Sequence, residues 1–168
     1  NLLMILQKAS ALGNFIRIDM EDSPWVETTL RLFNQMRHEQ GFDNVGIVIQ
    51  SYLYRSEADI RQLSEACSRV RLCKGAYKEP PEVALQEMDD IRRNFRECVR
   101  RLLDAGHYPA VATHDEGLVS DVLGYAISRE ELLASFCNHF ETLYEEARTG
   151  SRRPFETWRE SLVTLGRA

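Results

Sequence analysis

The sequence predicts an α/β fold, in which strands and helices alternate along most of the chain. Short β-rich runs end near residues 20, 50, 76 and 114, roughly 30 residues apart, with a helical pattern between each pair. The run 44–50 is almost continuously apolar, as in a parallel strand that is covered on both faces. Because such crossovers are right-handed, the pattern predicts a partial (β/α)8 (TIM-like) barrel of about four parallel strands, followed by a helical C-terminal tail.

Cap and turn residues divide the first part of the chain into elements. Residues 1–12 have helical spacing and stop at a glycine, which predicts the last part of a helix. The β-rich run 15–20 is the first strand. Pro24 opens the next helix, over residues 25–40, because the first turn does not need the N–H that proline lacks, and Gly41 ends it.

The same alternation continues through three more strands. The strand 44–50 is followed by a helix that begins at Ser56, where two acids in the first turn favour the helix dipole. The third strand and its exit loop cover residues 69–77, and the fourth strand covers 110–114. Between these two, a pair of prolines is expected to open a long helix over 80–105. Its expected inward positions are Val83, Met88, Ile91, Phe95, Val99 and Leu102.

Near residue 122 the alternation of strand and helix patterns ends, and only helical patterns follow. A capping box at 128–131 opens a helix over 129–148, and a proline opens another over 154–165. We therefore expect two segments, 1–121 and 122–168. Since a complete barrel needs about 250 residues, four units leave two edge strands open, which predicts self-association.

Composition excludes several classes of protein. The chain has 168 residues, is 43% hydrophobic and carries a net charge of −5, which fits a globular protein without the basic footprint of a nucleic-acid binder. The four cysteines form no C-x-x-C pair, so we expect reduced thiols and no metal site. No apolar run could span a bilayer, and the first residue is not methionine, so we expect a non-native N-terminus.

Polar side chains gather where each predicted strand ends. The carboxyl ends of parallel strands share one rim, where barrels hold their active sites, so we expect these residues to form one site. Small residues at 75–76 would let a ligand approach the backbone. Such a rim suits a large, planar, partly anionic ligand. The rim residues are Asp19, Glu21, Gln50, Tyr52, Arg71, Lys74, Tyr77, Thr113, His114, Asp115 and Glu116.

Taken singly, these residues also have structural interpretations. Asp19 could pair with Arg71 across neighbouring strands, residues 74–75 could form an ordinary turn, and His114 could be a core histidine. It is the coincidence of four consecutive strand ends that favours a site.

At these rims the sequence resembles the bacterial single-function proline dehydrogenases. The stretches that carry the resemblance are FIRIDMEDSPWVETTL, NVGIVIQSYLYRSEADI, RVRLCKGAYKEP and YPAVATHDE, which lie between about residues 14 and 116. The most specific part is R-L-x-K-G-A-Y followed by A-T-H-D. The resemblance implies FAD-dependent oxidation of L-proline to 1-pyrroline-5-carboxylate, with electrons passed to a membrane quinone. It also implies a cytoplasmic protein, for which attachment to the inner face of the membrane is a further option.

The resemblance also implies a role for each matching residue. Asp19 would anchor the polar network around the substrate carboxylate, and Tyr77 would pack near the substrate. The flavin ring would meet Gln50 and Arg71 at its polar edge. The FAD cradle would be lined by Lys74, Gly75 and Ala76, and the distal part of the cofactor would be held by Thr113, His114 and Glu116.

Two features depart from the family pattern. An early strand with an active-site lysine is expected to precede Asn1, and the helix with paired arginines that clamps the proline carboxylate has no match, since the surroundings of Arg152 and Arg153 differ from it. Residues 122–167 instead resemble the helical end of a biotin–protein ligase, which predicts a join near 117–121. We therefore expect a fragment with incomplete activity. The alternatives are a non-catalytic α/β remnant or binding module without flavin, and a biotin-ligase accessory fragment.

Overall fold

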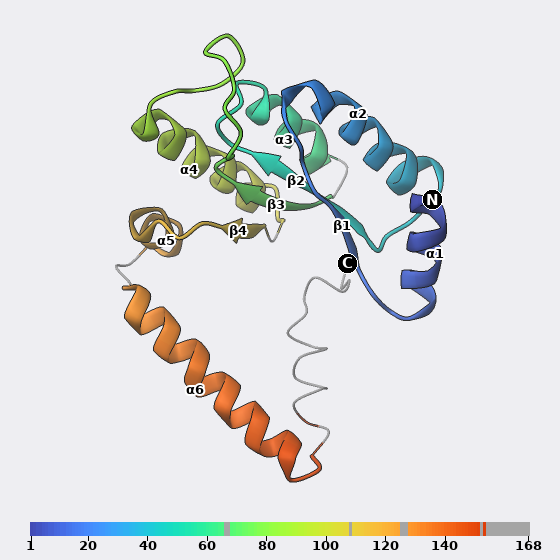
Figure 1. The fold of residues 1–168 in the computed structure, drawn as a ribbon, viewed down its shortest axis with the longest axis vertical. Helices are drawn as coiled ribbons and strands as arrows, with labels where there is room; N and C mark the ends of the chain where they lie inside the picture. The colour runs from blue at the N-terminus through green and yellow to red at the C-terminus, as the bar shows by residue number, and fades with distance from the viewer. Residues whose placement is uncertain (66–67, 108, 125–127, 152, 154–168) are drawn as a thin grey trace. The chain divides into compact units, whose positions relative to one another are not determined.

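The computed structural model describes residues 1–65, 68–107, 109–124, 128–151 and 153 (Figure 1). The chain divides into two compact units, Asn1–His114 and Asp115–Ala168. The first unit holds the sheet and the second is helical where it is described.

A four-stranded parallel sheet organises the first unit. Its strands are β1 (Ile16–Ile18), β2 (Val45–Gln50), β3 (Arg69–Cys73) and β4 (Ala110–Ala112), and they lie in sequence order. Each neighbouring pair is parallel, so the predicted βαβ succession is confirmed. The outer strands β1 and β4 are shorter than the β-rich runs in the sequence.

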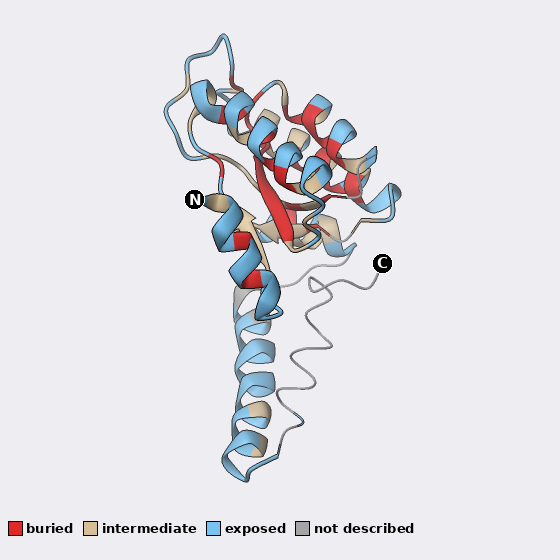
Figure 2. Cartoon of the chain, turned by 90° about the vertical axis from the view of Figure 1, so that its right-hand side faces the viewer, coloured by how far each residue is buried: buried red, intermediate tan, exposed pale blue. Residues whose placement is uncertain are grey.

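One helix of the first unit precedes the first strand, and the others lie between successive strands. These helices are α1 (Leu2–Ala11), α2 (Ser23–Asn34), which continues into a π-helical turn (Gln35–Glu39), α3 (Ser56–Glu65) and α4 (Met88–Asp104). Helices α2 and α3 contact β2, and α4 contacts β3 (Figure 1). All six residues of β2 are buried, which explains its continuous apolar run. Figure 2 shows the buried residues on β2 and on the helix sides that face the sheet.

The expected start of the fourth helix was wrong. The two prolines do not open it, because the backbone of residues 83–85 pairs with the β2 exit loop. Tyr54 N donates to Val83 O at 3.1 Å and Leu85 N donates to Tyr52 O at 2.8 Å. Helix α4 therefore begins only at Met88.

Of the six positions expected to point inward from the fourth helix, the last four are buried and the first two are not. Val83 and Met88 are 37% and 48% exposed, against the expectation, because they lie before the helix or at its first position. Ile91, Phe95, Val99 and Leu102 are buried as expected.

Among its described residues, the second unit contains one helix that the sequence did not predict and one that it did. Helix α5 (Glu116–Leu123) begins at Asp115, whose side chain accepts a hydrogen bond from Leu118 N, and ends at Gly124 with φ 76°. Helix α6 (Arg129–Arg148) begins at the predicted capping box of Ser128 and Glu131. The helix expected over 154–165 lies outside the described residues. Among the described helices, none is both long enough and apolar enough to cross a membrane.

Candidate functional site

The parallel register brings the predicted rim residues of the first three strands together. Cys73 pairs with Gln50 on one side and Ala112 on the other. Paired residues point to the same face of a sheet and residues two apart share a face, so Gln50 and Arg71 lie on one face. The Asp19 carboxylate, just after β1, lies 4.0 Å from the Arg71 guanidinium. Three strand ends therefore converge as the sequence predicted.

Gln50 is the most enclosed of these residues, with 4% of its surface exposed. Its Nε2 donates to Met20 O at 3.2 Å, which ties the end of β2 to the exit of β1. Its Oε1 is buried and has no hydrogen-bond partner among the described residues. A buried carbonyl without a donor is costly, so this atom is suited to accept a hydrogen bond from a bound ligand.

Two further arginines extend the positive charge along the same face. Arg17 and Arg69 both pair with Gly46, and their guanidinium groups lie 5.4 and 4.9 Å from the ring centroid of Phe15. Burial and the positive charges of Arg71 and Arg69 lower the pKa of Arg17. Sequence reasoning missed Arg17 and Arg69, although each stands two residues before a predicted site residue and so shares its face. The face is electropositive and favours an anionic ligand.

The segment after β3 is packed against the β2 exit loop. Gly75 has φ 109°, and a Cβ there would stand 2.3 Å from the Tyr52 ring. The Tyr52 ring therefore explains why a glycine is needed at position 75. The expectation that Gly75 makes room for a ligand stays a prediction.

Tyr77 and the residues after β4 are more exposed. The Tyr77 hydroxyl donates to the Glu21 carboxylate, and this hydrogen bond raises the pKa of Tyr77. Thr113 is half-buried, and His114 is exposed, which contradicts the core-histidine interpretation. Glu116 begins α5 in the second unit, so its expected part in the site stays a prediction.

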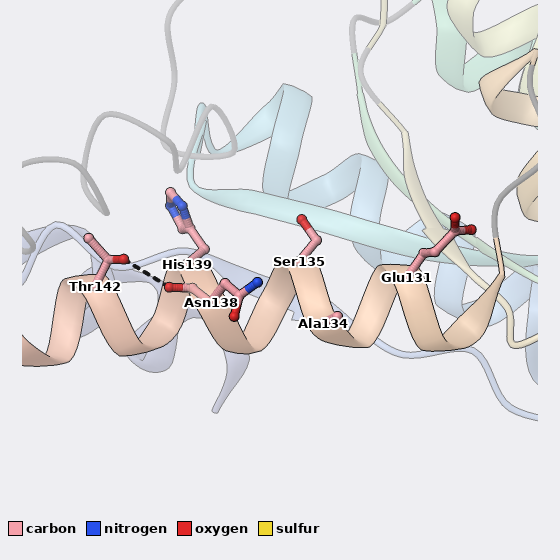
Figure 3. A pocket seen from close by; sticks show the side chains of 6 residues that line it. All are labelled: Glu131, Ala134, Ser135, Asn138, His139 and Thr142. Carbon is pink, nitrogen blue, oxygen red and sulfur yellow. Dashed lines mark hydrogen bonds between the residues drawn. The ribbon is translucent and has the colours of Figure 1, made fainter.

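A hollow of about 620 Å³ lies along α6, away from these strand-end residues in the sequence (Figure 3). Every described residue that lines it belongs to α6, and the hydrogen bond drawn there runs within the helix, from Thr142 Oγ1 to Asn138 O at 2.9 Å. Because these described lining residues all come from one helix, their side chains do not converge on a point, and we assign no chemistry to them. The lining residues are Glu131, Ala134, Ser135, Asn138, His139 and Thr142.

The three cysteines that the structure describes are free thiols in different surroundings. Burial raises the pKa of Cys98 to about 11 and also raises that of the half-buried Cys73, while Cys137 is exposed. A raised pKa lowers the fraction of reactive thiolate at neutral pH. In a Cys67→Ser chain we expect Cys137 to react first with a thiol reagent, Cys73 slowly, and Cys98 only on unfolding. Mass spectrometry of labelled peptides at several times measures this order, and early labelling of Cys98 would contradict the described packing.

Comparison with known proteins places this chain in a family. The model of the proline dehydrogenase family matches residues 1–144. The chain belongs to the proline dehydrogenase family. It is 42% identical over 128 residues to the proline dehydrogenase of Deinococcus radiodurans, an alignment that covers 76% of this chain and 41% of the relative. It is 37% identical over 144 residues to proline dehydrogenase 2 of Bacillus subtilis strain 168, covering 86% and 46%.

Solved structures of the family share the fold. Proline utilization A (PutA) from Bdellovibrio bacteriovorus, inactivated by N-propargylglycine, has a TM-score of 0.67 and 27% identity, covering 73% of this chain and 15% of that one. The D778Y mutant of Bradyrhizobium japonicum PutA has a TM-score of 0.65 and 25% identity, with the same coverage. The expected family and the barrel-like α/β fold are therefore confirmed. This member of the proline dehydrogenase family spans less than half the length of the curated relatives that it matches.

Proposed function

We propose that this chain supplies the flavin-facing strands of an FAD-dependent enzyme that oxidises L-proline to 1-pyrroline-5-carboxylate. The observation that carries the proposal is the convergence of Asp19, Gln50 and Arg71 at the ends of adjacent parallel strands. FAD, when bound, supplies the acceptor for the hydride that leaves the proline ring carbon next to nitrogen. We expect the activity of this chain alone to be incomplete.

Arg71 and Gln50 would bind the polar edge of the flavin ring. The Arg71 side chain is 41% exposed, so its guanidinium is accessible to a ligand, and Asp19 helps to orient it. A fixed cation at the electron-rich edge of the ring stabilises negative charge that develops there. The unpaired Oε1 of Gln50 fits an N–H donor on the ligand.

The remaining expected roles rest on the family resemblance. Lys74, Gly75 and Ala76 would line the cradle, and Thr113, His114 and Glu116 would hold the distal part of FAD. Tyr77 would pack near the substrate, and Asp19 would anchor the network around its carboxylate. Arg153 is paired with Glu146 at 2.8 Å, which supports leaving it out of the carboxylate clamp.

A flavin titration tests this proposal. We expect the chain to bind added FAD and to quench its fluorescence. The Arg71→Ala variant is expected to bind about ten- to a hundredfold more weakly, because a hydrogen bond to a charged group contributes about 1.5–3 kcal/mol. Arg61→Ala is a matched control, since Arg61 is 64% exposed on α3 and pairs only with Glu57 among the described residues. Equal binding by the parent and Arg71→Ala would remove Arg71 from the site. A chain that binds no FAD would favour the α/β module without flavin.

Partners and location follow from the same proposal. A quinone would accept the electrons, which is consistent with attachment to the membrane surface. The outer strands β1 and β4 would allow self-association through their edges. The family match runs to residue 144, inside α6, so we propose that this part of α6 belongs with the first segment. A biotin–protein ligase origin of 122–167, with a join near 117–121, is the alternative that this proposal excludes for residues up to 144, and it is not shown by the comparisons.

A further inference from the structure

A carboxylate from the segment after β3 caps helix α2 from a distance in sequence. Glu79 Oε1 accepts a hydrogen bond from Ser23 N at 2.6 Å, and Glu79 Oε2 accepts one from Ser23 Oγ at 2.7 Å. Asp22, the residue at the N-cap position, makes no side-chain cap hydrogen bond of its own. Glu79 therefore takes over the capping of α2, and its negative charge lies at the positive end of the helix dipole.

The segment that Glu79 anchors is the one expected to meet cofactor and substrate. Tyr77 stands two residues before Glu79, and Glu79 N donates to Tyr77 O at 3.1 Å, which makes a tight turn between them. The Tyr77 hydroxyl donates to Glu21, two residues before Ser23. Two hydrogen-bonded contacts, Tyr77 with Glu21 and Glu79 with Ser23, thus join the β3 exit segment to the β1 exit.

The β2 exit supports this segment through its backbone. Tyr52 N donates to Lys74 O and Leu85 N donates to Tyr52 O, both at 2.8 Å. Gln86 Nε2 donates to Glu79 O at 3.3 Å, so the far end of the segment also folds back on Glu79. Between these anchors, the Glu79 carboxylate makes charge-assisted hydrogen bonds with Ser23 that fix the middle of the segment. Such hydrogen bonds are about twice as strong as neutral ones.

We propose that Glu79 is a positioning residue for this site. By capping α2 at Ser23, it holds Tyr77 and the Lys74–Ala76 stretch above the strand ends. The part of this proposal that concerns flavin rests on the proposed function. The part that concerns Tyr77 does not, because the contact between Tyr77 and Glu21 exists without any ligand.

The first test follows the phenol of Tyr77 in the whole chain. Its titration is isolated by subtracting the tyrosinate absorbance of the Tyr77→Phe chain from that of the parent. Glu79→Gln is expected to lower the pKa of Tyr77 toward the ordinary tyrosine value, because the hydrogen bond to Glu21 that raises it would loosen. Ser23→Ala keeps the charge of Glu79 but removes one donor, so it should move the titration in the same direction by less. Glu82→Gln, the same change on an exposed residue of this segment, should leave it unmoved.

The second test measures FAD affinity of the same variants by fluorescence quenching. Glu79→Gln is expected to weaken binding about tenfold, the equivalent of one charge-assisted hydrogen bond, and Glu82→Gln to leave binding unchanged. Far-UV circular dichroism confirms that each variant is folded, and Glu79→Asp, which keeps the charge on a shorter side chain, should recover part of the loss.

The two readouts separate the possible failures. A Tyr77 titration that is unmoved in both Glu79→Gln and Ser23→Ala overturns the positioning role. If the Tyr77 titration shifts in the Glu79 and Ser23 variants but the parent chain binds no FAD, the positioning of Tyr77 is supported and the proposed function is overturned. A titration that moves while FAD affinity stays equal in all variants overturns the link from Glu79 to the cofactor. If Glu79→Gln does not fold, Ser23→Ala decides between these outcomes.

Discussion

Replacement of Phe95 by alanine is expected to destabilise the first unit by about 3–5 kcal/mol. Phe95 has no exposed surface and lies on the α4 stripe with Ile91, Val99 and Leu102, which packs toward β3. The loss combines the transfer free energy of the ring with the cost of the cavity that it leaves. Since domains of this size are stable by only about 5–15 kcal/mol, the variant should be near the limit of folding.

Urea unfolding followed by far-UV circular dichroism measures this loss. Hydrogen exchange of the β2 amides assigns the transition to the first unit, because the second unit contains no described strand. The matched control is Phe136→Ala on α6, where the ring is 65% exposed, and we expect a change within about 0.5 kcal/mol. A Phe95→Ala chain as stable as this control would contradict the packing of α4 on the sheet.

The sheet was predictable because each of its strands has a local signal. Strand β2 is buried along its whole length, and an unbroken apolar run is the pattern that such burial requires. The helices between the strands then predicted that the strands are parallel. Because parallel strands end at one edge of a sheet, this arrangement also predicted that Gln50, Arg71 and Asp19 would lie at the same edge.

The parts that the sequence did not predict depend on contacts between distant residues. The prolines before α4 carry a valid helix-start signal, but the backbone near Ala84 pairs instead with Leu53. Glu79 looks like any exposed acid in a loop, and its partner Ser23 is 56 residues away. Helix α5 was missed because the interval 117–121 was interpreted as a join. By contrast, Arg17 and Arg69 had a usable signal in the period-two alternation with Asp19 and Arg71.

The second large effect is expected at Gly75. Alanine there would have to keep φ at 109°, which residues with a side chain rarely adopt, at a cost of about 1–3 kcal/mol. Its Cβ would also overlap the Tyr52 ring, which is 5% exposed and so has little room to move. Overpacking of this kind costs about 1–3 kcal/mol more. We therefore expect Gly75→Ala to lose about 3 kcal/mol or more, measured by urea unfolding.

Gly106→Ala separates strain from overlap, because Gly106 also has a positive φ, 77°, but open space where its Cβ would stand. It should lose only about 1 kcal/mol. In the double variant Gly75→Ala with Tyr52→Ala, the loss should be smaller than the sum of the two single losses, because the overlap is gone. Strict additivity would show that Tyr52 does not dictate the glycine. The need for Gly75 would then come from the backbone angle alone, and the close packing of the β3 exit on the β2 exit, on which the positions of Lys74 and Tyr77 depend, would lose its support.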